Sequence, residues 1–281
     1  MGWEFVTRCS NAVKTDMKIS STTGKAGLLI CQLLLLTACV SPGGTPEIPM
    51  PFEFVEGGSD TANALLIFLP GRGDDMQTFK REGFIDLLHQ SGRPMDAVLT
   101  NAHLGYYYKG VLADRIYQDI LVPYRQKGYR RFFIVGTSLG GYGALWVNHE
   151  HADVIAGVVL IAPYLGKDRV LREIESEGST GAWRSGLERE PGIDDKVWLW
   201  IDDMNAGETR EIGKAILGFG QKDKFSRAAR LLTRSIPKSN VFVDDGGHNW
   251  TTWRKLWAEI MASDAWIRLG NDEETTRTDE K

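Results

Sequence analysis

A serine hydroxyl lies at the centre of the stretch GTSLGGYG, in which Gly136 and Gly140 flank Ser138. The Gly-x-Ser-x-Gly spacing is typical of a serine on a sharp strand-to-helix turn, where larger neighbours would collide with nearby backbone. Such a serine can attack a carbonyl carbon once a base takes its proton. Because the chain has 31 glycines in 281 residues, this spacing also arises by chance, and the assignment depends on partner residues elsewhere.

The partners of a nucleophilic serine are a histidine base and a carboxylate that orients the histidine. In α/β-hydrolase folds they follow the serine in the order Asp or Glu, then His, each in a loop after a strand. Asp223 follows the apolar run AILGFGQ, and His248 follows VFVDD. Ser138, Asp223 and His248 are therefore the predicted triad. Other aspartates are assigned to a strand-end turn (Asp244 and Asp245) or to a solvated surface (Asp202 and Asp203).

Four further histidines compete with His248 for a role. His89, His149 and His151 end amphipathic stretches, and the His-x-His spacing of the last two points their side chains apart on a helix. No metal site is expected there. His103 follows a predicted strand and either lines a pocket or packs within its loop.

An oxyanion hole needs two backbone N–H groups that point at the tetrahedral oxygen. Leu139 follows the serine directly and supplies the first predicted donor. The second is expected from the glycine-rich loop LPGRGDD, residues 69–75, where the N–H of Arg72 is the predicted donor. Asp74 or Asp75 is expected to cap the following helix.

Apolar runs and helical spacings alternate along the chain, and this alternation predicts the elements that position these residues. An α/β fold follows, a mostly parallel twisted sheet with helices on both faces. Strands are predicted at 64–69, 97–100, 132–135, 154–161, 215–219 and 240–243. Helices are predicted at 78–90, 111–127, 140–149, 225–234 and 250–269.

One interval breaks the alternation, from about residue 164 to residue 213. It is too long for an ordinary loop and is expected to form a cap inserted in the domain. Its tryptophans either line a pocket for an acyl chain or fill a small core of the cap. They are Trp183, Trp198 and Trp200.

The N-terminal segment has the layout of a bacterial secretory signal. Lys18 and Lys25 precede a short apolar run, and Leu36-Thr-Ala-Cys39 follows it. This ending resembles a lipobox, so residues 1–38 are expected to be removed and Cys39 to be acylated. An ordinary signal peptide with an incidental cysteine is the alternative, and translation from Met17 is an alternative start.

Cleavage at that point would change the cysteine count and the charge. Of the three cysteines only Cys39 would remain, and it would carry lipid, so no disulfide and no cysteine metal site is expected. The formal net charge of the whole chain is −4. Because residues 1–38 carry four basic and two acidic side chains, the mature chain would have a net charge of −6, which disfavours nucleic-acid binding. Residues 39–51 are expected to be the lipidated cysteine and a linker, residues 52–270 the domain, and residues 271–281 a disordered tail.

With these residues identified, the chain resembles the α/β-hydrolase superfamily serine esterases of the esterase D-like group. The resemblance rests on GTSLGGYGAL (136–145) and GHNWTTW (247–253), and it covers roughly residues 64–266. It implies acyl transfer to water or another acceptor through an acyl-serine, with neither a metal nor an organic cofactor. The family often has His-Gly before the oxyanion donor, whereas this chain has Pro70-Gly71.

The expected activity is hydrolysis of a small carboxylic ester by a serine hydrolase. An acyltransferase, a thioesterase and a peptidase share the same triad and stay as alternatives. A non-catalytic envelope lipoprotein on a hydrolase scaffold is an alternative of another class, since a fold does not fix a function. An exported lipoprotein bound to the membrane through Cys39 is expected, in the outer membrane if the cell has two membranes.

Overall fold

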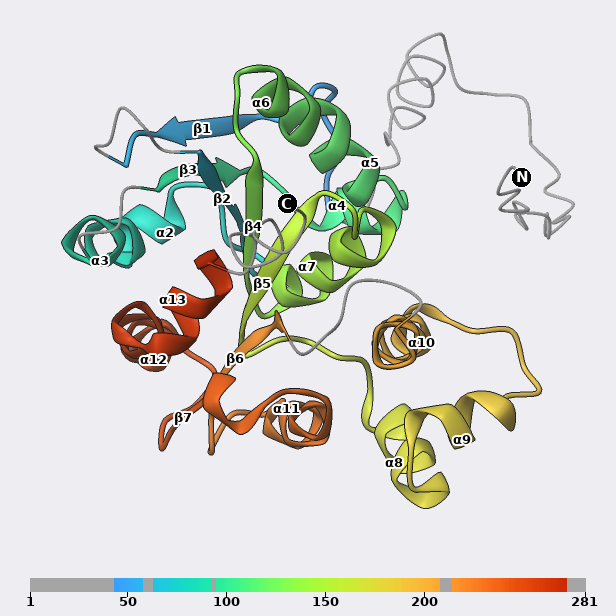
Figure 1. Cartoon of the computed structure of the whole chain (residues 1–281). Helices are drawn as coiled ribbons and strands as arrows, with labels where there is room; N and C mark the ends of the chain where they lie inside the picture. Colours follow the sequence, from blue (N-terminus) through green and yellow to red (C-terminus); the bar gives the residue numbers. More distant parts are fainter. Residues whose placement is uncertain (1–42, 58–62, 92–94, 208–213, 272–281) are drawn as a thin grey trace, which may run out of the picture. The chain divides into compact units, whose positions relative to one another are not determined.

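A computed structural model describes residues 43–57, 63–91, 95–207 and 214–271. This part of the chain is built on a seven-stranded sheet with the strand order β1-β3-β2-β4-β5-β6-β7 (Figure 1). Neighbouring strands are parallel throughout, except that β1 is antiparallel to β3. The predicted mostly parallel sheet is confirmed. The strands are β1 (Phe52–Val55), β2 (Ala64–Leu69), β3 (Asp96–Thr100), β4 (Arg131–Thr137), β5 (Ile155–Ile161), β6 (Ile216–Gly220) and β7 (Val241–Asp244).

The central strands are continuous apolar runs because both faces of the sheet are covered. All six residues of β2 are buried, as are all five of β3 and of β6. Each predicted strand is present within two residues of its expected ends. The strand that the sequence analysis missed is β1, a four-residue edge strand with only partly buried side chains.

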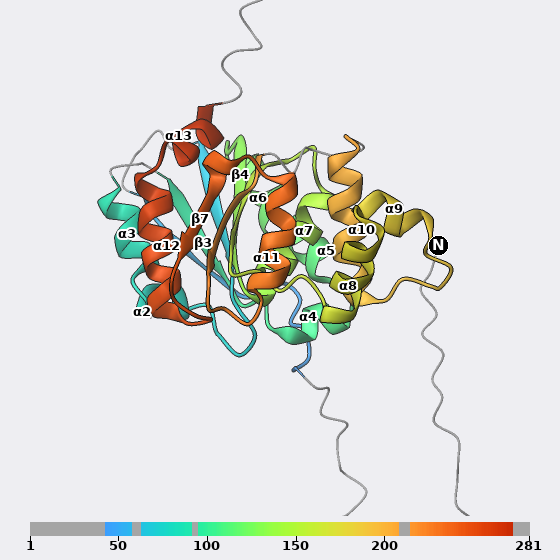
Figure 2. The same cartoon turned by 90° about the horizontal axis from the view of Figure 1, so that it is seen from below.

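Helices cover both faces of the sheet, as predicted (Figures 1 and 2). One face packs against α2 (Thr78–Arg81), α3 (Phe84–Gln90), α12 (Trp250–Ala262) and α13 (Asp264–Asn271). The other packs against α4 (Leu104–Tyr108), α5 (Leu112–Ile116), the π-helical turn η1 (Tyr117–Leu121), α6 (Val122–Gln126), α7 (Leu139–Glu150) and α11 (Ser226–Leu232). Two 3₁₀ turns, η3 (Thr233–Ser235) and η4 (Lys238–Asn240), lead into β7.

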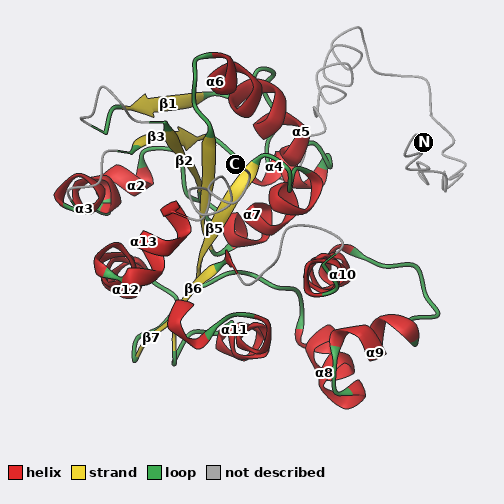
Figure 3. Cartoon of the chain, in the orientation of Figure 1, coloured by secondary structure: helices red, strands yellow, loops and turns green. Residues whose placement is uncertain are grey.

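Several helices are divided where the spacing predicted one continuous helix (Figure 3). The predicted helix 78–90 is two helices because Gly83 adopts a left-handed φ of 75°. The predicted helix 111–127 contains the π-helical turn, after which Pro123 stands in the first turn of α6. The backbone stays helical through the π-helical turn, in which the Val122 N–H donates to the Tyr117 carbonyl. The predicted helix 250–269 breaks at Ser263, whose backbone is extended.

Three helices occupy the interval expected to be a cap, namely α8 (Asp168–Glu177), α9 (Thr180–Ser185) and α10 (Ile193–Asn205). The Trp198 indole donates a hydrogen bond to the Leu165 carbonyl at 2.7 Å. Trp200 stacks on Trp146 of α7 with ring centres 6.0 Å apart. Because these side chains belong to the same apolar cluster as the α7 face of the sheet, the cap has no small core of its own.

Residues 43–51 belong to the segment that the sequence assigns to the linker, and they contact α4 and η1. The Met50 N–H donates to Asp119 Oδ2 at 2.8 Å, and the Met50 side chain is buried. The Tyr106 hydroxyl donates to the Glu47 carbonyl at 2.9 Å. Cys39, the predicted signal segment 1–38 and residues 272–281 lie outside the described residues. Among the described residues, no helix is both long and apolar enough to cross a membrane.

Candidate active site

Ser138 stands between the end of β4 and the start of α7, on the predicted sharp turn. Its φ of 50° and ψ of −113° lie in a region that non-glycine residues rarely adopt. Three backbone hydrogen bonds hold it there. Its N–H donates to the Ile161 carbonyl at 3.0 Å, and its own carbonyl accepts from Gly141 at 3.0 Å and from Tyr164 at 2.9 Å. The strain at this residue is therefore maintained by β5 and the segment after it.

The glycines around Ser138 are required by close backbone packing. A Cβ on Gly136 would collide with the Gly140 carbonyl, and one on Gly140 would collide with the Leu69 carbonyl at the end of β2. A Cβ on Gly141 would lie 2.6 Å from the Pro163 side chain. Because α7 can approach β2 and β5 this closely only without side chains at these positions, the glycines fix where the helix begins.

The structure brings Ser138, His248 and Asp223 together. His248 Nε2 lies 3.0 Å from Ser138 Oγ. On the other side of the ring, His248 Nδ1 lies 2.8 Å from Asp223 Oδ2 and 3.0 Å from Oδ1. The Asp223 side chain is fully buried and accepts a further hydrogen bond from the Phe225 N–H at 2.7 Å. This is the geometry that a serine nucleophile, a base and an orienting carboxylate need.

Aromatic rings hold the His248 imidazole on two sides. Phe225 and Trp253 both meet it nearly perpendicularly, with ring centres 4.9 and 4.8 Å away. Tyr164 packs in turn on Phe225 at 5.3 Å. Burial and the hydrogen bond that its hydroxyl donates to Asp194 raise the pKa of Tyr164 far above its usual range. The hydroxyl therefore stays protonated at neutral pH and acts as a donor.

The other predicted aspartates lie elsewhere. Asp244 accepts a hydrogen bond from the Gly246 N–H at 2.7 Å, which agrees with its assignment to a strand-end turn. Asp202 and Asp203 were expected to be solvated, and this is wrong. Asp202 accepts a hydrogen bond from Thr180 at 2.8 Å and pairs with Arg184, and Asp203 pairs with the same arginine.

The other histidines also lie away from Ser138. His103 packs within its loop, where Nδ1 accepts from the Gly105 N–H at 3.1 Å. His149 Nε2 lies 3.0 Å from Asp203 Oδ2, and His151 stacks on Tyr117. His89 lies 3.2 Å from the Glu56 carbonyl on the surface. Within the described ranges no group of three or more His, Cys, Asp or Glu side chains could hold a metal ion.

The two predicted oxyanion donors lie on either side of the serine. Leu139 is the first residue of α7, and the first N–H groups of a helix have no partner within it. The loop after β2 reaches the serine at Gly71, because a Cβ on Gly71 would stand 3.5 Å from Ser138 Cβ. Arg72, the next residue, is exposed. The two segments follow the neighbouring strands β2 and β4, whose connections lead to opposite sides of the sheet, to β3 and to β5. Ligands bind at such a point in open α/β sheets.

Asp74, in the same loop, is a residue whose place the sequence did not predict. Burial raises the pKa of its carboxyl, a hydrogen bond from the Trp250 side chain partly offsets this rise, and the charge of Asp75 adds to it. The expectation that Asp74 or Asp75 caps α2 is wrong, because the N-cap residue is Gln77 and the helix start has no side-chain cap hydrogen bond. Asp75 accepts the Gln77 N–H just before the helix at 2.9 Å. Two consecutive aspartates carry the same signal in the sequence, so only the fold distinguishes them.

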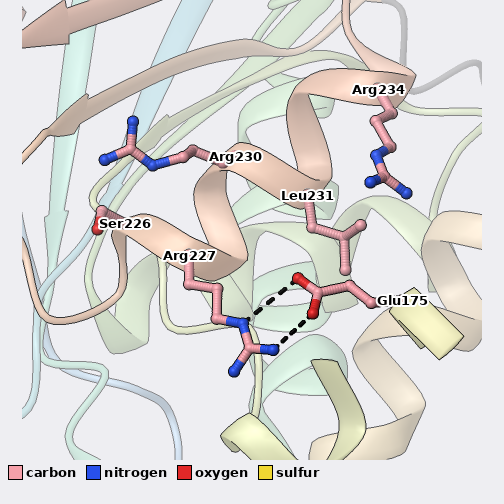
Figure 4. A pocket seen from close by; sticks show the side chains of 6 residues that line it. All are labelled: Glu175, Ser226, Arg227, Arg230, Leu231 and Arg234. Atoms are coloured by element: carbon pink, nitrogen blue, oxygen red, sulfur yellow. Dashed lines mark hydrogen bonds and ion pairs between the residues drawn. The ribbon is translucent and has the colours of Figure 1, made fainter. Parts of the chain in front are cut away.

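A pocket of about 230 Å³ lies on the side of α11 that faces α8, and the residues of the candidate triad do not line it. The Arg227 guanidinium donates to both Glu175 oxygens, at 3.3 and 2.5 Å, whereas Arg230 points away from that carboxylate (Figure 4). Arg230 donates instead to the Gln221 carbonyl at 3.2 Å. Because the Glu175 carboxylate is already paired with Arg227, we assign this pocket to the contact between α8 and α11 and not to a ligand site. Its lining residues are Glu175, Ser226, Arg227, Arg230, Leu231 and Arg234.

Comparison with known families gives a match over most of the described domain. The family model described as "Putative esterase" matches residues 77–263. Among curated proteins, no sequence matches this chain.

Solved structures with a similar fold are distant in sequence. A ferulic acid esterase is 17% identical with a TM-score of 0.51, over 79% of this chain and 96% of that one. Est1E from Butyrivibrio proteoclasticus is 12% identical with a TM-score of 0.51, over 78% and 94%. MGS-MChE2, an α/β hydrolase from the metagenome of lagoon sediments at Mar Chica, Morocco, is 17% identical with a TM-score of 0.50, over 77% and 94%. At these identities the likeness concerns the α/β-hydrolase fold alone.

Proposed function

Since this chain belongs to the Esterase family and is a carboxylesterase-like serine hydrolase with the α/β-hydrolase fold, we propose that Ser138, His248 and Asp223 are its catalytic triad. The observation that carries the proposal is the continuous set of contacts from Ser138 Oγ through both nitrogens of His248 to the buried Asp223 carboxylate. A scaffold used only for binding has no need of this arrangement. The substrate is proposed to be a carboxylic ester, and the intermediate an acyl-serine.

The first half of the proposed reaction forms the acyl-enzyme. His248 Nε2 takes the proton of the Ser138 hydroxyl as Oγ bonds to the ester carbonyl carbon. Asp223 accepts the Nδ1–H, which keeps Nε2 as the free base and stabilises the imidazolium. When the tetrahedral intermediate collapses, the carbon–oxygen bond to the alcohol breaks and His248 gives its proton to the leaving oxygen.

The second half releases the acid. His248 takes a proton from water, and the hydroxide oxygen bonds to the acyl carbon. The bond to Ser138 Oγ then breaks, and the proton returns from His248 to the serine. Apart from the ester and one water molecule, these steps use only groups of the chain itself.

We propose that the negative oxygen in both halves is held by the backbone N–H groups of Leu139 and Arg72. The position of Leu139 at the start of α7 supports the first donor, since a helix N-terminus also favours negative charge. The approach of Gly71 to Ser138 supports the second. Each such donor lowers the barrier by about 3 kcal/mol.

The test is hydrolysis of p-nitrophenyl esters of short, medium and long acyl chains by the purified full chain and by Ser138→Ala. The substitution is expected to lower kcat by at least about 10³-fold, because it removes the nucleophile. Ser226→Ala is a matched control, since Ser226 lies three residues beyond Asp223 and outside the triad. A fluorophosphonate should add its mass to a peptide that contains Ser138. Unchanged turnover in Ser138→Ala would refute the assignment of the nucleophile.

We also propose that the protein is exported and lipidated at Cys39, and that it is held in the bacterial cell envelope by this anchor. Support comes from the sequence, in which two lysines, an apolar run and Leu36-Thr-Ala-Cys39 follow one another. Val40 follows the cysteine, and no aspartate stands there as an inner-membrane retention signal would require. The outer membrane is therefore the proposed location in a cell with two membranes.

A further inference from the structure

The loop after β2 contains a tight turn that presents Arg72. The Asp74 N–H donates to the Gly71 carbonyl at 3.2 Å, so Arg72 and Gly73 are the two central residues of the turn. Gly73 has a φ of 90°, which suits the third position of a type II turn. The direction of the Arg72 N–H therefore depends on how this turn is held against Ser138.

The Asp74 side chain folds back across the turn toward the serine. Its Oδ2 lies 2.7 Å from the point where a Cβ on Gly71 would stand, and that same point is 3.5 Å from Ser138 Cβ. The carboxyl thus packs on the backbone of Gly71, within the same small volume as the serine side chain. It does not extend into solvent as the neighbouring Asp75 does.

The other contact of Asp74 leads to the element that carries the base. The Trp250 side chain lowers the pKa of the Asp74 carboxyl as a nearby hydrogen-bonding group does, and the indole N–H is the one donor that this side chain has. Trp250 is the first residue of α12, two residues beyond His248. Its ring meets Trp253 at 4.8 Å, and Trp253 meets His248 at 4.8 Å. Asp74 therefore connects the loop of the second oxyanion donor to the residues that hold the imidazole.

This position is unfavourable for a carboxylate whose role is only structural. Burial raises the pKa of Asp74, so its ionised form is destabilised in the folded protein. Asp75 already accepts the Gln77 N–H and pairs with Arg81 at 2.9 Å, so the start of α2 does not need Asp74. A carboxylate that is destabilised by burial and lies beside a proposed catalytic centre is expected to have a role in that centre.

We propose that Asp74 is a positioning residue that fastens the Pro70–Asp74 loop to Trp250 and thereby aims the Arg72 N–H at the oxyanion. This inference rests on the proposed function and adds a group to its machinery. Asp74 acts through the backbone of its own loop and does not exchange a proton with the substrate. An interaction that matters only when the oxyanion forms should affect kcat and leave KM unchanged.

The test compares Asp74→Ala, Asp74→Asn, Trp250→Phe and the control Asp75→Ala on a p-nitrophenyl ester. Asp74→Ala is expected to lower kcat by about 10- to 100-fold with KM within about twofold, because a donor displaced by about 1 Å loses most of its effect. Asp74→Asn should restore most of the rate, since the amide oxygen still accepts from the indole. Asp75→Ala should match the wild type in both constants.

A second measurement separates catalysis from folding. The rate constant of fluorophosphonate labelling should fall in Asp74→Ala by the same factor as kcat, because the reagent also places a negative oxygen in the hole. If Asp74→Ala does not fold, Trp250→Phe decides, since it removes the N–H but keeps a ring against Phe79 and Phe84. This variant should show the same loss.

Three results would overturn the inference. One is wild-type kcat in folded Asp74→Ala or in Trp250→Phe. Another is a loss that appears in KM, and the third is a loss that Asp74→Asn does not restore. A wild-type protein that neither hydrolyses esters nor reacts with the fluorophosphonate would refute the proposed function itself, and that result is distinct from a normal wild type with unaffected variants.

Discussion

Asp223 is the buried carboxylate of the candidate triad. Its side chain is fully buried, and its oxygens accept from His248 and from the Phe225 N–H. In Asp223→Asn the amide would present N–H groups to His248 Nδ1 and favour the tautomer whose Nε2 carries the proton. We expect kcat on a p-nitrophenyl ester to fall by about 10⁴-fold, the effect known for the corresponding change in a serine protease.

The matched control for this prediction is Asp245→Asn. Asp245 is exposed and lies in the loop just before His248, so it was an alternative partner for the histidine. This variant should keep kcat within about twofold of the wild type. If Asp245→Asn lost activity and Asp223→Asn kept it, the acid of the triad would be assigned wrongly. Thermal unfolding of both variants shows whether the loss reflects catalysis or folding.

Gly140 tests how closely α7 must approach β2. A Cβ at this position would collide with the Leu69 carbonyl, which is part of the sheet and cannot turn aside. Gly140→Ala should therefore reduce the free energy of unfolding by about 1–3 kcal/mol, as overpacking does, and displace Ser138. Urea unfolding monitored by tryptophan fluorescence measures the first effect, and ester hydrolysis measures the second.

Gly186→Ala is the control for Gly140→Ala. Gly186 has a φ of −91°, and the nearest atoms to an added Cβ lie 3.8 Å away, which is ordinary contact. Its free energy of unfolding should stay the same or rise slightly, since alanine restricts the unfolded chain. Equal losses in the two variants would contradict the role assigned to the close approach.

Single residues also show where sequence reasoning reaches its limit. Ser138, Asp223 and His248 could be identified because strand-end loops carry them in a fixed chain order. Asp74 could not, because it differs from Asp75 through burial and through Trp250, which is 176 positions away in the chain. Burial and the indole donor give Asp74 its character, and both arise from tertiary contacts.

At the scale of elements, the buried strands were predictable and the ends of the helices were not. A strand covered on both faces must be apolar throughout, so its limits are visible in the sequence. The π-helical turn at Tyr117–Leu121 and the break at Ser263 follow a periodic pattern that continues past them. The edge strand β1 was missed because Glu53 interrupts its short apolar run FEFV, whereas β7 is equally exposed but begins with three apolar residues.

Asp195 lies near the start of α10, and its charge should stabilise this part of the fold. Although burial opposes ionisation, hydrogen bonds from Arg189 at 2.5 and 2.6 Å and from the Gly192 N–H lower the pKa of Asp195. A folded-state pKa below the unfolded value means that the ionised form stabilises the protein at neutral pH. Asp195→Asn should therefore reduce the free energy of unfolding at pH 7 by about 2 kcal/mol.

The pH dependence of that loss identifies its origin. The difference between the wild type and Asp195→Asn should be constant above pH 5, begin to shrink near the unfolded pKa of about 3.9, and disappear as the pH falls through the lower folded-state pKa. Glu190→Gln, at an exposed neighbouring residue, should show no such trend. Urea midpoints at several pH values measure both, and a loss that persists in acid would show that the charge is not its cause.

At the scale of the whole molecule, the negative net charge bears on how the protein would be held at a membrane. The formal net charge of −4 gives no overall attraction to anionic lipid surfaces, so charge does not contribute to the proposed membrane attachment. Acyl chains on Cys39 are the proposed source, since two or more buried chains make attachment stable where a single chain does not.

The anchor is tested by Cys39→Ser, with Cys31→Ser as the control. Both cysteines lie in or beside the apolar segment, but only Cys39 ends the Leu-Thr-Ala-Cys motif. In bacterial cells, Cys39→Ser should leave the membrane fraction and lose the mass of the acyl groups, because the thiol proposed to carry them is absent. Cys31→Ser should stay in the membrane fraction with an unchanged mass, since the proposed processing would remove residues 1–38. Membrane attachment and mass unaffected by Cys39→Ser would exclude this anchor, and p-nitrophenyl ester hydrolysis by the released protein would show that the domain works without it.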